Sequence, residues 1–204
     1  MIYFTSDQHF WHSNILKYCP NRPYATVEEM NEALVSNWNN LVRQEDEVIS
    51  VGDFSLAIRP VEVYTPRLIG KKTIVAGNHD WIHPHHKKSN TPTKQAQLIG
   101  KYHEAGWETV VTTEMRLYIP TIGEVKICHI PYYGSEDHHT DDKYAKYRPI
   151  DDGTILLCGH VHQSWKTSRS SKGTLMINVG VDVWDMKPVS MDEIATLIKK
   201  ETSS

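Results

Sequence analysis

Thr73-Ile74-Val75-Ala76, followed at once by Gly77-Asn78-His79-Asp80, is the stretch of this chain that decides its fold. The first four residues are apolar or β-branched and predict a short buried strand, after which the glycine permits a tight turn. Asn78 and His79 therefore present ligand-type side chains directly beyond a strand. Four other segments repeat this arrangement of an apolar run that ends in a metal-binding side chain. They are Asp7-Gln8-His9, Gly52-Asp53, Cys128-His129 and Gly159-His160-Val161-His162.

Helical signals separate the strands in the first half of the chain. Thr26-Val27-Glu28-Glu29 is a capping box and predicts a helix to about Val42. Further helices are expected over 60–69, where Pro66 is unfavourable, from Pro92 to about Ala105, and from Met191 to about Lys200. Strands are expected near 2–5, 48–51, 73–76, 108–113, 115–119, 124–129, 154–158 and 174–179. This order predicts layers of helices and mixed sheet.

Length and composition are those of an ordinary globular protein. A chain of 204 residues can bury a full core, so we expect one domain over residues 1–204. The net charge of −3 does not favour a general nucleic-acid binder. No signal peptide or membrane-spanning stretch is evident, which makes the cytoplasm the expected location. Three widely spaced cysteines argue against a disulfide scaffold, whereas 12 histidines are unusually many.

The five segments place their polar residues where open α/β sheets bind ligands, beyond the carboxyl ends of strands. If the strands lie side by side, seven or eight ligand-type side chains converge. Carboxylate, amide and imidazole donors without thiolate suit Mn²⁺, Fe, Zn²⁺, Ni²⁺ or Co²⁺ better than Ca²⁺. Two such ions, bridged by Asp53, can clamp a phosphoryl group and lower the pKa of a water. His79, kept protonated by Asp80, can donate a proton to the leaving oxygen, and a role bracing the ligands is the competing interpretation.

Together the motifs resemble the signature of the calcineurin-like metallophosphoesterases, in particular the small bacterial and phage members. The resemblance implies an α/β fold, a four-layer β-sandwich of two mixed sheets flanked by helices, with a dimetal site at the C-terminal ends of the strands. It implies that one metal is held by Asp7, His9, Asp53 and His162. It implies that the other is held by Asp53, Asn78, His129 and His160. His79 would be the acid or stabilise phosphoryl charge, and Asp80 would orient it. These members usually carry glycine where this chain has Trp11.

The function expected from the motifs is a dimetal-dependent phosphoesterase, with Mn²⁺ the favoured metal. A metal-bridging hydroxide would attack phosphorus in line, and the expected substrates are phosphodiesters such as cyclic or short nucleotides. A phosphomonoesterase, a DNA or RNA nuclease and a non-catalytic scaffold are the alternatives. Loops 81–92 and 131–153 are expected to carry specificity. Candidate substrate contacts, for which packing or surface roles are comparable alternatives, are His12, Asn14, Arg22, Tyr132 and Arg148.

Overall fold

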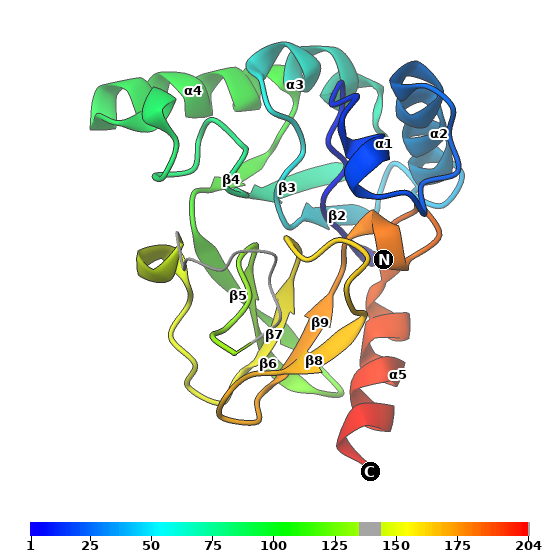
Figure 1. The fold of residues 1–204 in the computed structure, drawn as a ribbon, viewed down its shortest axis with the longest axis vertical. Coiled ribbons are helices and arrows are strands. Elements are labelled where there is room, and N and C mark those ends of the chain that lie inside the picture. Colours follow the sequence, from blue (N-terminus) through cyan, green and yellow to red (C-terminus); the bar gives the residue numbers. More distant parts are fainter. Residues whose placement is uncertain (135–143, 204) are drawn as a thin grey trace.

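Two five-stranded sheets stacked face to face form the centre of the computed structural model, which describes residues 1–134 and 144–203 (Figure 1). In the first sheet four strands are parallel and the edge strand β10 is antiparallel. Its spatial order is β10 (Val189–Ser190), β1 (Ile2–Thr5), β2 (Glu47–Ser50), β3 (Lys71–Val75) and β4 (Thr109–Val111).

The second sheet is mixed as well, because β6, β7 and β9 are parallel while both edge strands are antiparallel to their neighbours. Its spatial order is β5 (Glu114–Ile119), β6 (Gly123–Cys128), β7 (Ile155–Cys158), β9 (Leu175–Asn178) and β8 (Thr167–Arg169). The predicted α/β fold with two mixed sheets and flanking helices is confirmed. The short strands β8 and β10 are absent from the sequence-based prediction, because three and two residues give too little alternation to read.

Four helices lie on the outer side of the first sheet (Figure 1). They are α1 (Ile15–Tyr18), α2 (Val27–Asn39), α3 (Ile58–Tyr64) and α4 (Pro92–Ala105). Thr26 caps α2 by accepting a hydrogen bond from the Glu29 N–H, as the capping box predicts. The predicted helix over 60–69 instead ends at Tyr64 and continues as the 3₁₀ turn η1 (Thr65–Arg67), because Pro66 cannot continue an α-helical ladder.

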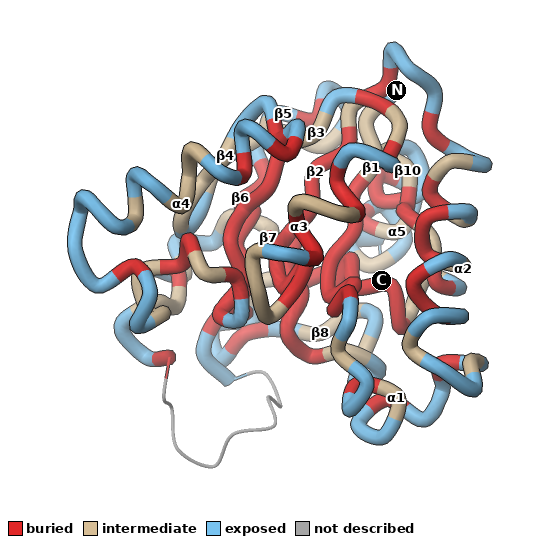
Figure 2. Tube along the Cα trace, turned by 90° about the horizontal axis from the view of Figure 1, so that it is seen from above, coloured by how far each residue is buried: buried red, intermediate tan, exposed pale blue. Residues whose placement is uncertain are grey.

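Strand side chains alternate between two cores, as the period of a strand requires. Val48 and Ile74 face the helices and pack in a cluster with Trp38. Ile49 and Val75 face the second sheet and share a cluster with strand residues of that sheet and with the apolar side of α5 (Met191–Thr202). Figure 2 shows the central strands buried, whereas α2 alternates between buried and exposed positions.

The outer face of the second sheet is covered by irregular segments of the chain and by the indole ring of Trp165. Cys128, Leu156 and Met176 pack there with Tyr132 and Tyr144. The segments around these tyrosines include the 3₁₀ turn η3 (Ala145–Tyr147), and Trp165 adds to the layer. All three cysteines are free and buried. Within the described residues, no helix has the length and apolar character needed to cross a bilayer.

Candidate metal centre

Both sheets deliver donor side chains to one edge, each from the turn that follows a strand. Asp7 and His9 follow β1, Asp53 follows β2, and Asn78 follows β3. The second sheet adds three imidazoles, from His129 after β6 and from His160 and His162 after β7. The seven predicted ligands therefore come from turns separated by up to about 150 positions in the chain and are brought together only by the stacking of the two sheets.

The Asp53 carboxylate lies at the centre of this group. Its Oδ2 atom is 3.3 Å from His129 Nε2 and 3.7 Å from His9 Nε2. Among the described residues, three groups of donor atoms lie within 4.8 Å of one another, and two of them consist of predicted ligands alone: Asp7, His9 and His162 in one, and Asp53 itself with His129 and His160 in the other. We call these two groups the first and second clusters. The remaining group joins His162 to Cys19 and Asp182. The geometry is consistent with a dimetal site in which Asp53 lies between two ions.

Buried donor atoms without partners test whether these residues fit a metal. Asn78 Oδ1 and His9 Nε2 are buried and have no hydrogen-bond partner among the described residues. An unsatisfied buried polar atom costs roughly 1–3 kcal/mol, so native structures rarely leave one without a ligand. An amide oxygen and an imidazole nitrogen directed into one carboxylate-rich space fit divalent cations.

Hydrogen bonds fix which ring nitrogen of two histidines faces the site. His129 Nδ1 lies 2.7 Å from the Val51 carbonyl, and His162 Nδ1 lies 3.0 Å from Asp182 Oδ2. A carbonyl oxygen can only accept, so His129 Nδ1 carries the proton and Nε2 presents its lone pair to the centre. The Asp182 carboxylate favours the same arrangement at His162.

The carboxylates make the centre favourable for positive charge. Although burial opposes protonation, the neighbouring Asp53 raises the pKa of His129 to about 9. Burial is likewise outweighed at His162, where Asp7 and the bond to Asp182 raise the pKa to about 11. A divalent cation would supply the same positive charge and replace these protons.

Strained backbone is concentrated in the donor residues. Five of the seven have a positive φ in the left-handed region: Asp7 (60°), His9 (53°), Asp53 (52°), His160 (74°) and His162 (47°). Such conformations cost about 1–3 kcal/mol each for residues other than glycine and persist only where the surroundings impose them. Backbone bonds between the turns impose them here, since the Asp7 N–H donates to the Gly52 carbonyl and the His9 N–H to that of Asp53.

The turns approach so closely that a glycine is required where β3 ends. A Cβ atom at Gly77 would lie 2.2 Å from Asp53 Oδ1 and 2.3 Å from the Asp53 nitrogen. Because the neighbouring His79 N–H donates to Asp53 Oδ1 at 2.9 Å, the turn after β3 also holds the central carboxylate in place.

His79 differs from the other imidazoles in its exposure. Its side chain is 45% exposed, and Nε2 lies 3.9 Å from Asp53 Oδ2. It lines a pocket of about 430 Å³ whose floor is formed by the metal-type donors. An imidazole at this position can reach a bound phosphoester without belonging to either cluster.

Asp80 does not hold the His79 ring in the way that the sequence predicted. Its carboxylate is fully buried and accepts hydrogen bonds from the backbone N–H groups of Asp53, Phe54 and Gly77 at 2.8, 3.1 and 2.8 Å. Burial, followed by the Asp53 charge, raises the pKa of Asp80 to about 7. Asp80 therefore ties the turn after β2 to the turn after β3.

Of the predicted substrate contacts, His12 lines the pocket, with its ring centroid 5.4 Å from that of His9. Asn14 is exposed at the start of α1 and is not a lining residue. Arg22 lies inside the protein, where the residue is 3% exposed and its donors are engaged by interior acceptors. Tyr132 is fully buried and donates to the Thr154 carbonyl, and Arg148 donates to the Pro131 carbonyl. Both side chains hold the described ends of the 131–153 loop, whose residues 135–143 lie outside the described part of the chain.

Sequence reasoning also missed residues that the structure places at the site. Asp182 holds His162, and Tyr18, Cys19 and Tyr144 line the pocket. Asp182 follows β9 in the turn η4 (Val181–Val183), so the strand-end rule that found the other donors points to it as well. Tyr18 and Cys19 lie at the C-terminal end of α1 and Tyr144 directly precedes η3, so none of the three follows a strand.

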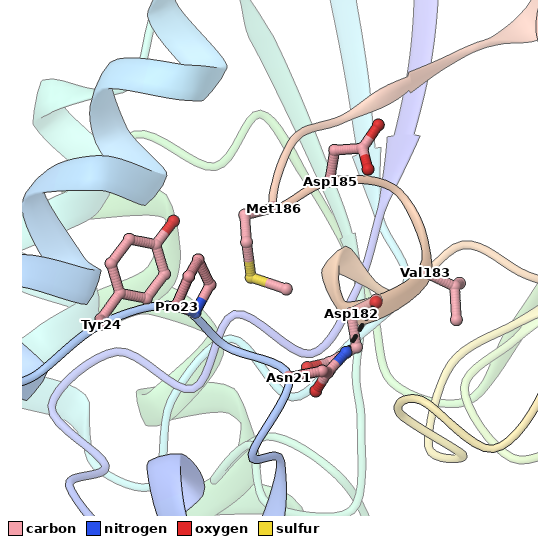
Figure 3. Close-up of a pocket in the computed structure, with 7 residues that line it drawn as sticks. All are labelled: Asn21, Pro23, Tyr24, Asp182, Val183, Asp185 and Met186. Carbon is pink, nitrogen blue, oxygen red and sulfur yellow. Dashed lines mark hydrogen bonds between the residues drawn. The ribbon is translucent and has the colours of Figure 1, made fainter.

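A second hollow of about 390 Å³ has Asp182 among its lining residues (Figure 3). It is bordered by Tyr24, Met186 and Asp185, and the Asn21 amide donates to the Asp182 carbonyl at its wall. None of the seven predicted ligands lines it, whereas five of them line the pocket beside His79, which is therefore the candidate substrate site.

The fold and the site define the class: an α/β sandwich with buried His/Asp clusters consistent with a dimetal centre. More particularly, the chain belongs to the calcineurin-like phosphoesterase superfamily, whose domain model matches residues 1–196. It is 32% identical to the Gene 66 protein of Mycobacterium phage L5, with 96% of this chain and 93% of that protein covered. It is also 32% identical to an uncharacterised protein of Methanocaldococcus jannaschii, covering 98% and 92%.

A solved structure shares the fold. It is a protein of unknown function from Aquifex aeolicus, with a TM-score of 0.64 and 22% identity over 97% of this chain and 98% of that one.

Proposed function

We propose that this protein is a dimetal-dependent phosphoesterase that hydrolyses small phosphodiesters of nucleotide type. The observation that carries the proposal is the convergence of seven donor residues, five of which line a pocket that His79 borders. Asn78 Oδ1 and His9 Nε2 are buried there without a hydrogen-bond partner among the described residues. When bound, two divalent ions would neutralise phosphoryl oxygens and lower the pKa of a water toward neutrality. The donor set makes Mn²⁺ the first ion to test.

The side chains at the pocket would have separate roles in catalysis. His79, half-exposed above Asp53, is in a position to donate a proton to the leaving oxygen or to stabilise phosphoryl charge. His12 packs between His9 and Tyr18, with ring centroids 5.4 and 6.0 Å away, and offers a second imidazole to substrate. Asp80 acts on the backbone that carries Asn78 and His79.

Pocket size and aromatic character support a nucleotide-type substrate. The hollow of about 430 Å³ suits a ligand of small-molecule size. Tyr18 lies beside His12, and the Tyr144 ring is 5.4 Å from that of His160, so aromatic rings border the donors from two segments. Nucleobases stack on such rings.

The proposal is tested by hydrolysis of bis-p-nitrophenyl phosphate with added Mn²⁺. We expect turnover that Asp53→Ala abolishes, because that carboxylate belongs to the second cluster and also lies 3.7 Å from His9 of the first cluster. Turnover by the wild type no greater than that of the Asp53→Ala variant would exclude a phosphodiesterase, and absence of bound Mn²⁺ would favour a scaffold.

A substrate panel then separates the possible phosphoesterases. Cyclic nucleotides and linear dinucleotides are expected to be cleaved faster than mononucleotides, whereas the reverse order would indicate a phosphomonoesterase. Cleavage of single-stranded DNA that falls steeply with salt would indicate a nuclease. A single domain over residues 1–204 and a cytoplasmic location stay predictions.

A further inference from the structure

Arg22 and Asp182 form an ion pair that lies entirely inside the protein, with both side chains 0% exposed. The pair is bidentate: Arg22 Nε donates to Asp182 Oδ1 and Nη2 donates to Oδ2, both at 2.8 Å. A fork of this kind fixes orientation as well as distance.

The other donors of the guanidinium reach the strained turn after β1. Nη2 also donates to the Asp7 carbonyl at 2.7 Å, and Nη1 donates to the Gln8 carbonyl at 3.1 Å. These carbonyls belong to the turn in which Asp7 and His9 hold left-handed backbone conformations. Arg22 therefore anchors the segment that carries two members of the first cluster.

The Asp182 carboxylate connects the same pair to the third member. Its Oδ2 atom lies 3.0 Å from His162 Nδ1, while Oδ1 and Oδ2 both accept from Arg22. Asp7 and His9 follow a strand of the first sheet and His162 follows a strand of the second, so one buried pair joins the two halves of the first cluster. In the second cluster, the Val51 carbonyl holds His129 instead.

We propose that Arg22 and Asp182 are positioning residues that set the affinity of the first cluster for its cation and leave the second cluster unaffected. The inference rests on the dimetal centre of the proposed function. A buried ion pair is by itself weak support for a stabilising role, because desolvation offsets much of the attraction. What points to positioning is that the pair contacts or holds Asp7, the adjoining Gln8 and His162 simultaneously.

The test measures the binding of Co²⁺ alone. Calorimetry and the visible absorption of the bound ion both monitor the binding. The wild type should bind two ions. Asp182→Asn should lower the affinity for one of the two ions roughly tenfold to a hundredfold, which is the usual effect of removing a group that orients a metal ligand. The absorption spectrum of that ion should change, while the affinity and spectrum of the other ion stay the same. Arg22→Lys, which keeps the charge but loses the fork, should weaken the same ion.

Double variants show which cluster is affected. With the second cluster disabled by His129→Ala, adding Asp182→Asn should lower the affinity of the single remaining site. With the first cluster disabled by His162→Ala, adding Asp182→Asn should change nothing. Arg67→Lys is the matched control, because Arg67 makes a similar fork to Glu32 at 2.9 and 2.6 Å on the surface.

The outcomes separate this inference from the proposed function. Failure of the wild type to bind two ions would remove the dimetal centre and both proposals. Two ions bound with unchanged affinity in Asp182→Asn and Arg22→Lys would overturn only the positioning role, and so would equal weakening of both ions. Retained Co²⁺ binding at the second cluster also shows that a variant is folded. If Asp182→Asn does not fold, the same measurements on Arg22→Lys test the inference.

Discussion

His79 exposes 45% of its side chain, whereas the imidazoles of His9 and His129 expose 1% each. This difference separates a residue that can meet substrate from residues that can only meet a buried ion. Proton donation by His79 matters most where the leaving oxygen is a poor leaving group.

We therefore expect His79→Ala to lower kcat by about 10²–10⁴-fold on a cyclic nucleotide, whose leaving group is an alkoxide, and by less on bis-p-nitrophenyl phosphate. Steady-state kinetics on both substrates, with metal content measured in parallel, checks this. Equal losses on the two substrates would argue for charge stabilisation instead of proton donation.

His83 is buried although it begins a polar and basic run over 83–90. The ring is 2% exposed and its Nδ1 accepts from the His85 N–H at 3.1 Å. Burial, together with the nearby His129, lowers the pKa of His83 from 6.5 to about 4.

Between these two pH values the unfolded chain binds a proton at His83 that the folded chain does not. The neutral ring therefore contributes its full stability above pH 6.5, and that contribution is lost as the pH falls toward 4. At about 1.4 kcal/mol per pKa unit, the difference between 6.5 and about 4 corresponds to a loss of at most about 3.5 kcal/mol. We expect urea unfolding at pH 7 and pH 4.5 to show that the free energy of unfolding falls less on acidification in His83→Asn than in the wild type. An identical loss would contradict it.

At the scale of the element, the turns after β2 and β3 interlock, and glycine is required at position 77 because there is no room for a side chain. A methyl group at Gly77 would meet both the nitrogen and the carboxylate of Asp53. By contrast, Gly100 lies within α4 and a Cβ there would meet nothing within 4 Å.

The two glycines give opposite predictions for the same substitution. Gly77→Ala should displace Asp53, lowering both the free energy of unfolding and Mn²⁺ affinity. Gly100→Ala should raise the free energy of unfolding by about 0.5–1 kcal/mol, because alanine loses less backbone entropy in a helix. Denaturant titrations of both variants, with Mn²⁺ binding measured alongside, check the pair. Unchanged Mn²⁺ binding in Gly77→Ala would contradict the interlocked turns.

At the scale of the whole molecule, the centre joins the two sheets: each cluster takes donors from both. Asp7 and His160 are bonded across this junction as well, since the His160 N–H donates to the Asp7 carboxylate at 3.1 Å. Cations bound here would link the sheets, and a ligand that binds only the folded state stabilises it.

Removal of metal should therefore lower the Tm. At a free Mn²⁺ concentration of 100 times the Kd, one site stabilises by about 2.7 kcal/mol, which for a protein of this size corresponds to several degrees. Thermal unfolding of chelator-treated and Mn²⁺-reloaded protein measures the shift, and Asp53→Ala should lack it. Equal Tm values with and without Mn²⁺ in the wild type would contradict a cation at the junction.

The sequence by itself determined the strand–turn pattern, the helix caps and the chemical type of the donors, because each depends on residues that are close together in the chain. The end of α3 before Pro66 and the capping of α2 by Thr26 follow from the same local physics. Only the tertiary structure decided that Asp80 binds backbone, that Tyr132 is buried and that Arg22 pairs with Asp182. The last contact joins residues 160 positions apart, and no local pattern contains the packing of two sheets that brings them together.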